Sequence, residues 1–204
     1  MEKIPTGIDL EMTGLDPKVD CILEFAQVLL TRDLEPIDDF GSRVLHASEE
    51  QLAVMSDYVR EMHTQTGLLD EVRASTLTVE ALEDEVIEFL AGHGHVQHDD
   101  PRDRTVITLG ASLRADMAFI DEYMPRLAKV VHYRIVDVSG FRETLEMILP
   151  GFKAPQPFQV AAEDGYAVHR AASDIRWSIA ELREIRDVLR PLWDQSLHNE
   201  GAAA

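Results

Sequence analysis

The chain has 204 residues, which suits one domain of ordinary size, and its 45% hydrophobic and 28% charged residues are typical of a globular protein. Its 38 acidic and 19 basic residues give a formal net charge of −19, and no basic stripe of the kind that holds long nucleic acids is visible. No apolar run reaches the roughly 18 residues of a membrane span, the N-terminus lacks the order of a signal peptide, and the single Cys21 excludes an internal disulfide. We therefore expect a cytoplasmic protein without a membrane partner. The acidic surface has two explanations: it disfavours the binding of long nucleic acids, or it only increases solubility.

The first half of the chain predicts three strands and then two helices. Apolar and β-branched runs indicate strands at 4–10, 21–31 and 36–46. Apolar residues at helical spacing follow at 49–66 and 78–91. Consecutive strands with short connections form an antiparallel meander.

The second half alternates strands with helices. A buried strand at 105–110 leads into a helix at 112–124, and a strand near 133–138 leads into a helix at 140–149. A long final helix is expected at 171–190. A meander followed by alternating α and β elements favours an α/β fold with a central mixed sheet flanked by helices.

Two polar stretches rich in Gly and Pro, 93–101 and 150–166, are expected to be loops. The end of the chain, from Ser196, has the composition of a frayed tail. We therefore predict a single domain over 1–192 and a flexible tail over 193–204.

The loop at 93–101 offers an alternative metal site. His93, His95 and His98 with Asp99 have ligand types that suit zinc. Since no predicted strand or helix fixes these side chains, we favour a solvated loop.

Asp9 and Glu11 are the first candidates for chemistry. On a strand, residues i and i+2 point to the same face, so both carboxylates project together while Ile8 and Leu10 point to the other face. Two carboxylates on an apolar strand are costly unless a cation lies between them, and Mg²⁺ or Mn²⁺ suits such oxygen ligands. In so acidic a chain, however, the spacing also arises by chance.

His169 and Asp174 stand just ahead of the final amphipathic helix. Five residues apart within one helix, they would lie about 140° from each other. They share a site only if His169 precedes the helix and curls back over its first turn, where a carboxylate such as Asp174 is favoured. A neutral imidazole is the usual group for taking a proton from water. The alternative is a capping aspartate beside a surface histidine.

Asp116 is a further candidate, one turn into the helix that follows the buried strand at 105–110. It neighbours the apolar Phe119 and Ile120. In isolation, a solvated helix face explains it equally well.

Together these elements are more specific than any one of them. Asp-x-Glu on a first strand, Asp early in a middle helix and His-x4-Asp opening the last helix resemble the histidine-type DEDD exonuclease superfamily. Within it the chain is most similar to the oligoribonuclease family, whose opening motif residues 8–16 match nearly letter for letter. Residues 60–63, 132–134, 137–139, 174–176 and 178–182 match as well. The resemblance runs from about residue 4 to 190 and implies a ribonuclease H-like fold.

The resemblance also implies an activity, 3′→5′ hydrolysis of short RNA, dinucleotides above all, to nucleoside 5′-monophosphates. Asp9, Glu11 and Asp174 would bind two divalent metal ions, Mg²⁺ or Mn²⁺. Asp116 would complete that site, partly through water, and His169 would be the general base.

The family's substrate-binding residues have counterparts here. Leu15 would lie between the two bases of the substrate, and several polar side chains would surround its 5′ phosphate. Tyr133 would reach the site from the other subunit of a homodimer. The implied substrate-binding set is Met12, Leu15, His63, Ser112, Tyr133, Arg134 and Ser139.

The chain departs from the family at several points. Gly7 stands where the family usually has tryptophan, and Ala111 replaces the asparagine of its Gly-Asn-Ser. The loop at 92–104 is longer, and the segment before His169 is unlike the family's. These changes leave the expected metal ligands intact and bear on substrate fit instead.

Three alternatives to this function remain. A related exonuclease, ribonuclease T-like or proofreading, would trim longer 3′ ends or take another short nucleotide, and should carry basic patches that this chain lacks. A degenerate binding protein should have lost one of the five catalytic residues. A purely structural domain would have no reason to gather carboxylates around one histidine.

Overall fold

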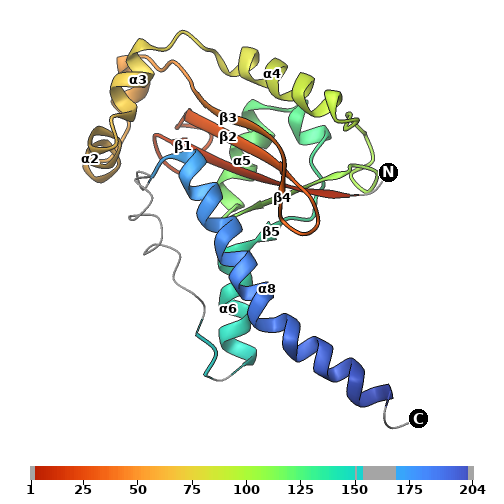
Figure 1. Ribbon diagram of the computed structural model, residues 1–204. Coiled ribbons are helices and arrows are strands. Elements are labelled where there is room, and N and C mark those ends of the chain that lie inside the picture. The colour runs from red at the N-terminus through yellow and green to blue at the C-terminus, as the bar shows by residue number, and fades with distance from the viewer. Residues whose placement is uncertain (1–2, 150, 154–168, 202–204) are drawn as a thin grey trace.

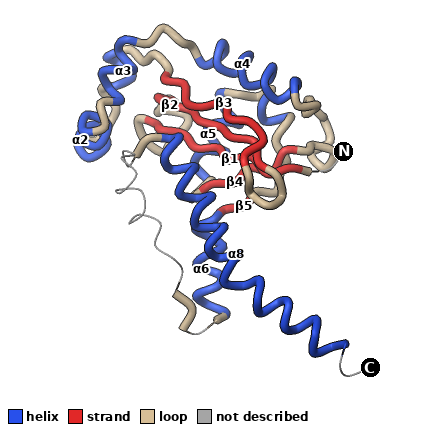
Figure 2. Tube along the Cα trace, viewed as in Figure 1, coloured by secondary structure: helices blue, strands red, loops and turns tan. Residues whose placement is uncertain are grey.

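The computed structural model describes residues 3–149, 151–153 and 169–201. A five-stranded mixed sheet lies at its centre, in the order β3-β2-β1-β4-β5 (Figures 1 and 2). The first three strands form the expected antiparallel meander. β4 then pairs in parallel with β1, and β5 pairs in parallel with β4. The α/β fold class is therefore confirmed. The strands are β1 (Ile4–Met12), β2 (Ile22–Leu30), β3 (Pro36–Val44), β4 (Val106–Gly110) and β5 (Val136–Asp137).

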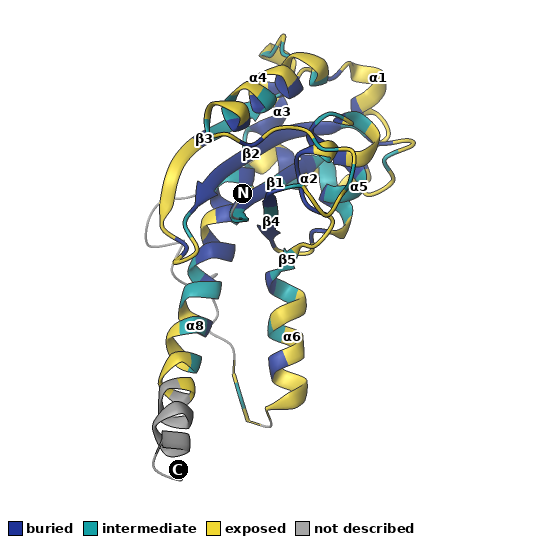
Figure 3. Cartoon of the chain, turned by 90° about the vertical axis from the view of Figure 1, so that its right-hand side faces the viewer, coloured by how far each residue is buried: buried dark blue, intermediate teal, exposed yellow. Residues whose placement is uncertain are grey.

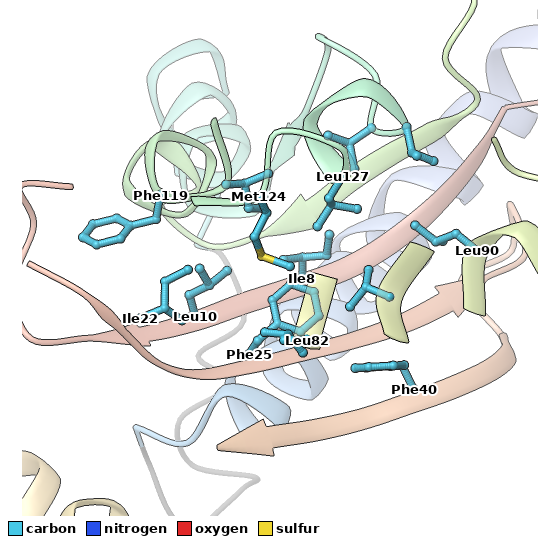
Figure 4. Close-up of a cluster of buried hydrophobic side chains, with 14 of the residues drawn as sticks. Ile8, Leu10, Ile22, Phe25, Phe40, Leu82, Leu90, Phe119, Met124 and Leu127 are labelled. Carbon is cyan, nitrogen blue, oxygen red and sulfur yellow. The ribbon is translucent and has the colours of Figure 1, made fainter. Parts of the chain in front are cut away.

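Helices cover both faces of the sheet. On one face α4 (Val79–Gly92) and α5 (Arg114–Tyr123) pack on the apolar cluster of Figure 4, to which β1 contributes Ile8 and Leu10. On the other, α8 (Ala171–Gly201) crosses the sheet. None of the helices in the described part of the chain is both long and apolar enough to cross a membrane.

The region expected as one helix at 49–66 is divided into two, and a third helix follows. Ser56 accepts a hydrogen bond from the backbone of Val59, so it caps a new helix and interrupts the predicted one. Gly67 has φ of 76°, a conformation that favours glycine and that separates the second helix from the third. These helices are α1 (Glu49–Leu52), α2 (Asp57–Gln65) and α3 (Leu68–Ala74).

The later elements also shift against expectation. The strand expected near 133–138 is reduced to β5, because the Asp137 side chain caps α6 (Val138–Ile148) two residues early. A 3₁₀ turn, η1 (Leu127–Lys129), precedes it.

The final helix α8 runs to Gly201, eleven residues past its expected end, and carries Pro191 inside it. The described part of residues 193–204 is thus helical, where we expected a tail without regular structure. The division into a domain of residues 1–192 and a flexible tail stays a prediction. Most of the loop expected at 150–166 lies outside the described residues.

Gly7 marks the closest approach of α8 to β1. A Cβ atom at this position would lie 2.6 Å from Ile175 Cγ2 and 3.0 Å from Val28 Cγ1. The side chain of Ile175 thus takes the space into which a larger residue 7 would project. A tryptophan, which the family usually has here, would not fit against this helix.

Gly7→Val should therefore lower the free energy of unfolding by about 1–3 kcal/mol, because overpacking forces neighbouring side chains from their rotamers. Thermal unfolding of the purified protein measures this. Gly92→Ala is the matched control, since nothing lies within 4 Å of a Cβ built there. An unchanged melting temperature for Gly7→Val would contradict the close packing.

Candidate active site

Three carboxylates converge where β1 meets the first turn of α8. Oxygen atoms of Asp9, Glu11 and Asp174 all lie within 4.8 Å of one another. Asp9 and Glu11 share a strand face, and Asp174 comes from the helix that crosses this face. Spacing predicted that Asp9 and Glu11 project together, the family resemblance added Asp174, and the three side chains lie side by side here.

Asp116 lies beside this cluster, on α5. It is buried, and its Oδ1 accepts a hydrogen bond of 3.0 Å from the backbone N–H of Leu10, between Asp9 and Glu11. Its charge acts on both of those carboxylates. Four acidic side chains thus share one region, in which Glu11 and Asp116 are buried and Asp9 and Asp174 half-buried.

Their electrostatics are unfavourable without a cation. Burial, and then repulsion from Asp116, Asp174 and Glu11, raises the pKa of Asp9 well above its ordinary value. Burial, and then repulsion led by Asp174, raises the pKa of Glu11 to about 8. Burial likewise raises the pKa of Asp174 to about 7 and that of Asp116 to about 6. A cation here would offset charge that the fold itself leaves unbalanced.

The donor set fits a hard divalent cation. Every candidate ligand is a carboxylate oxygen, which Mg²⁺ and Mn²⁺ prefer. Within the described residues, the buried Asp174 Oδ1 has no hydrogen-bond donor. A buried acceptor of this kind is rare in folded proteins unless water or an ion satisfies it.

His169 precedes α8, as the spacing required. It has φ of 61°. Burial raises the pKa of the Asp174 carboxyl, and the backbone of His169 lowers it. The same pocket is lined by Asp9, Asp174 and His169, and His169 is exposed to solvent. An imidazole can therefore reach water beside the carboxylates.

A pair of serines forms the neighbouring wall of this pocket. The hydroxyl oxygens of Ser112 and Ser139 lie 3.3 Å apart, and the N–H of Ser112 donates to Ser139 Oγ at 3.0 Å. Asp137 holds both, since its carboxylate accepts from the Ser139 hydroxyl and from the N–H groups of Ser112 and Leu113. Burial alone would raise the pKa of Asp137, but these bonds and one from Gly140 lower it.

The sequence interpretation missed Asp137 as a member of the site. It lies in the matched stretch 137–139, but the resemblance assigned it no role in binding metal or substrate. The signal that could have found it is an aspartate with serine two residues on, a pattern typical of a helix N-terminus.

The pocket continues between α6 and α8, where Arg142 pairs with the buried Glu181 at 3.1 Å. Ala111 and Trp177 also line it. The sequence interpretation did not include Arg142 or Glu181, because nothing in their local spacing places them opposite each other.

The other predicted substrate-binding residues are spread around the cluster. His63 is fully buried, with Nε2 3.0 Å from the carbonyl oxygen of Met12 and Nδ1 3.9 Å from Glu11. It lies behind Glu11 and does not line the serine pocket. Tyr133 and Arg134 are exposed, with the Arg134 guanidinium 5.3 Å from the Tyr133 ring centroid.

Leu15 is presented on a rigid turn after β1. Its side chain is 76% exposed, although the turn itself is tied down. The buried carboxylate of Asp20 accepts from the Thr13 hydroxyl and from the Asp16 N–H, each at 3.0 Å. A large apolar side chain on so well fixed a turn is suited to contact with a partner or ligand.

The histidines of the 93–101 loop do not form a metal site. His93 Nδ1 bonds to the Phe89 carbonyl and His95 Nδ1 to the Thr105 hydroxyl. Among the described residues, the one group with metal-ligand spacing is Asp9, Glu11 and Asp174. The loop differs from expectation in one respect, since His95 is buried.

Comparison with known proteins agrees with this geometry. The exonuclease family matches residues 6–182. An oligoribonuclease of Corynebacterium diphtheriae is 40% identical over 91% of this chain and 81% of its own length. The chain belongs to the oligoribonuclease family. An oligoribonuclease of Mycobacterium sp. (strain KMS) is 38% identical over 88% of this chain and 78% of its own length.

Solved structures of exonuclease I share the fold. That from Methylocaldum szegediense has a TM-score of 0.63 at 17% identity, over 97% of this chain and 43% of that one. The Escherichia coli enzyme in complex with a dA16 oligonucleotide has a TM-score of 0.65 at 15% identity, over 95% and 43%. This chain spans less than half the length of either. The likeness confirms the expected ribonuclease H-like architecture.

Proposed function

We propose that this protein is a metal-dependent 3′→5′ exoribonuclease that hydrolyses short oligoribonucleotides, dinucleotides above all, to nucleoside 5′-monophosphates. Family membership supports the reaction class. The observation that carries the proposal is the meeting of Asp9, Glu11 and Asp174 within 4.8 Å, with Asp116 beside them and His169 on the same pocket.

Each residue has a part in this proposal. Asp9, Glu11 and Asp174 would hold two Mg²⁺ or Mn²⁺ ions, and Asp116 would complete the site partly through water. Bound ions would supply a Lewis acid and an activated nucleophile. His169 takes a proton from the attacking water, since its exposed side chain borders the carboxylates.

The pocket wall supports recognition of a phosphate. The Ser112 and Ser139 hydroxyls, fixed by Asp137, can donate to an anionic oxygen. In the proposal Arg134 and His63 join them around the 5′ phosphate, while Leu15 and Met12 contact the bases. Neither side chain lines the serine pocket, since Arg134 is exposed to solvent and His63 is buried behind Glu11. Both would therefore move toward the phosphate when substrate binds.

The test of this function is a length series. The purified protein is incubated with 5′-phosphorylated RNAs of two to twenty nucleotides, with Mn²⁺ or with EDTA. Release of nucleoside 5′-monophosphates that depends on Mn²⁺ is expected. Full activity in excess EDTA, or release of internal fragments, would rule the proposal out.

Size selectivity separates this function from a ribonuclease T-like enzyme that trims longer 3′ ends. The net charge of −19 opposes a long phosphate backbone. A two-nucleotide RNA with a 5′ phosphate should therefore be cleaved at least about tenfold faster, in kcat/KM, than a seven-mer.

Arg134→Ala should remove most of that preference, because a charge-assisted hydrogen bond contributes about 1.5–3 kcal/mol. Arg73→Ala is the matched control, since Arg73 pairs with Glu49 on the surface. Equal kcat/KM values for the two RNAs with the wild-type protein would favour the ribonuclease T-like alternative.

The proposal includes a homodimer. Figure 3 shows α6 and α8 side by side, extending beyond the sheet, and Figure 1 shows α8 continuing past α6. Trp193 is 65% exposed there and Met147 75%. Exposed apolar side chains of this size mark interaction surfaces. A groove beside them is lined by the apolar Leu34, Phe141, Leu182, Ile185, Leu189 and Trp193 and by the charged Arg32, Asp33, Arg186 and Arg190.

Within this dimer, Tyr133 would reach the partner's site. The side chain is 53% exposed and is not among the residues that line its own pocket. Mixing His169→Ala protein with Tyr133→Ala protein should then restore activity. Half of the random dimers are mixed and have one complete site of two, so about a quarter of wild-type activity is expected. Mixtures no more active than their components would contradict the shared site.

We also propose the cytoplasm as the site of action. Its reducing conditions suit a chain whose only cysteine, Cys21, is a free thiol.

A further inference from the structure

Arg170 joins two separate elements to the turn that precedes α8. Its Nε and Nη2 contact the carboxylate of Glu24, on β2, at 3.0 and 3.1 Å. Its Nη1 and Nη2 contact the carboxylate of Glu71, on α3, at 2.9 and 2.8 Å. One guanidinium therefore makes bidentate contacts with two acidic side chains, and we call Glu24, Arg170 and Glu71 the Arg170 clamp.

The clamp also fixes the backbone at the start of α8. The carbonyl oxygen of Arg170 accepts from the N–H groups of Ser173 and Asp174 at 2.8 and 3.1 Å. Glu24 Oε2 accepts from the N–H of Ala171 at 3.2 Å. Three N–H groups at the N-terminus of α8, those of Ala171, Ser173 and Asp174, thus find acceptors in Glu24 and Arg170. Asp174 receives its position from this turn.

His169, next to Arg170, has a conformation that needs such support. A φ of 61° is uncommon for a residue other than glycine and costs free energy, so it persists only where its surroundings determine it. The neighbouring Arg170 makes bidentate contacts with Glu24 and with Glu71. Because these contacts fix Arg170 to the sheet and to α3, they also restrict the backbone of His169 next to it.

Glu24 gives the clamp a second role. It is 1% exposed and stands directly opposite Glu11 in the antiparallel pairing of β1 and β2. Its charge adds to the repulsion on Asp9, Glu11 and Asp174. The Ser42 hydroxyl and the Arg170 guanidinium both bond to Glu24. Arg170 therefore offsets a charge that would otherwise disturb the cluster.

We propose that Arg170 is a positioning residue for the hydrolytic reaction, and that through Glu24 and Glu71 it holds His169 beside Asp9, Glu11 and Asp174. The inference rests on the proposed function, because it assigns Arg170 an effect on the group that takes the proton. Arg170 itself touches no reacting atom in this assignment.

Arg170→Ala should lower kcat by about 10–100-fold, the range typical of residues that orient a ligand or base from behind. KM should change less than about threefold, because the serine wall of the pocket is untouched. Arg170→Lys should recover part of kcat, since an ammonium can contact one carboxylate but cannot bridge both bidentately. Arg183→Ala is the matched control, because Arg183 also lies on α8 and pairs with Glu35, away from the pocket. It should keep the wild-type kcat.

A double-mutant cycle separates positioning from a general loss of structure. If Arg170 acts through His169, adding Arg170→Met with Glu24→Gln, which leaves no unpaired buried charge, to His169→Ala should slow the enzyme by less than about threefold more. Effects that multiply in full would overturn the proposal, because Arg170 would then act by another route. A second cycle combines Glu71→Gln with His169→Ala. Glu71 is half exposed, so its substitution leaves no buried charge without a partner. Glu71→Gln should lower kcat less than Arg170→Ala does, and it should slow the His169→Ala protein little further.

The metal-free protein gives a readout that does not depend on activity. Amide exchange of Ser173 and Asp174 should quicken at least about tenfold in Arg170→Ala and stay unchanged in Arg183→Ala. The paired variant Glu24→Gln with Arg170→Met removes both charges, so it should regain thermal stability but not kcat. Recovery of kcat in that variant, or unchanged exchange in Arg170→Ala, would overturn the proposal. Failure of the proposed function would differ, because the wild type would then release no monophosphates from short RNA.

Discussion

Asp9→Asn should lower the rate of RNA hydrolysis by more than about 100-fold. Mutation of residues that only hydrogen-bond to metal ligands already lowers activity by about 10–100-fold, and Asp9 is a proposed ligand itself. The same change should raise the melting temperature of the metal-free protein. Asp9 lies in a buried cluster with Glu11, Asp116 and Asp174, so an amide removes one of four mutually repelling groups. Function and stability should therefore move in opposite directions, as expected of a site built to hold cations.

Metal binding should reverse the order of stabilities. Mn²⁺ should raise the melting temperature of the wild type more than that of Asp9→Asn, because a ligand stabilises the state that binds it. Thermal unfolding in EDTA and in Mn²⁺ measures both effects. Asp121→Asn, an exposed substitution on α5, should change neither rate nor metal response. A metal-free Asp9→Asn protein that is less stable than the wild type would contradict the repulsion.

The pH dependence of the metal-free protein follows from the same groups. Burial and repulsion give folded pKa values of about 8 for Glu11, about 7 for Asp174 and about 6 for Asp116, against ordinary values of 4.5, 3.8 and 3.8. A raised carboxyl pKa means that stability is fully present below the unfolded pKa and is lost as pH rises through the folded pKa. The melting temperature in EDTA should thus fall between roughly pH 4 and 8, and fall less in Asp9→Asn.

The sheet could be predicted because its strands carry their own signal. Ile8 and Leu10 alternate with Asp9 and Glu11, so period two fixes both the strand and the face that each side chain takes. The helix boundaries were less predictable. Ser56 and Asp137 act as caps only because the backbone turns there, and polar residues of these types also occur within helices.

The acidic cluster was predictable from local geometry together with the family resemblance. Spacing alone placed Asp9 with Glu11 and put His169 ahead of α8, but chain order cannot bring α8 onto β1. The Arg170 clamp could not be predicted from the sequence for the same reason. Its ion pairs join residues 146 and 99 positions apart, and neither Glu24 nor Glu71 differs locally from the chain's other acidic residues.

The proposed base is tested by His169→Ala, which should lower kcat by about 10²–10⁴-fold, the usual contribution of a general base. The Mn²⁺ affinity, measured by calorimetry, should change little, since the cluster of Asp9, Glu11 and Asp174 keeps its oxygen atoms. His46→Ala is the matched control, because His46 is exposed on another surface and does not line the pocket.

The pH profile of kcat supplies the decisive readout. A general base must be unprotonated to take a proton, so the wild-type rate should fall as the pH is lowered and the rate of His169→Ala should not. The profile is measured at saturating Mn²⁺, because Glu11 and Asp174, whose pKa values burial raises to about 8 and about 7, also take up protons on the acid side when no cation holds them ionised. With the carboxylates bound, an acid limb that disappears with His169 belongs to the imidazole. A His169→Ala protein that keeps the wild-type kcat and the acid limb would mean that His169 only shapes the turn before α8, and that water loses its proton to another group.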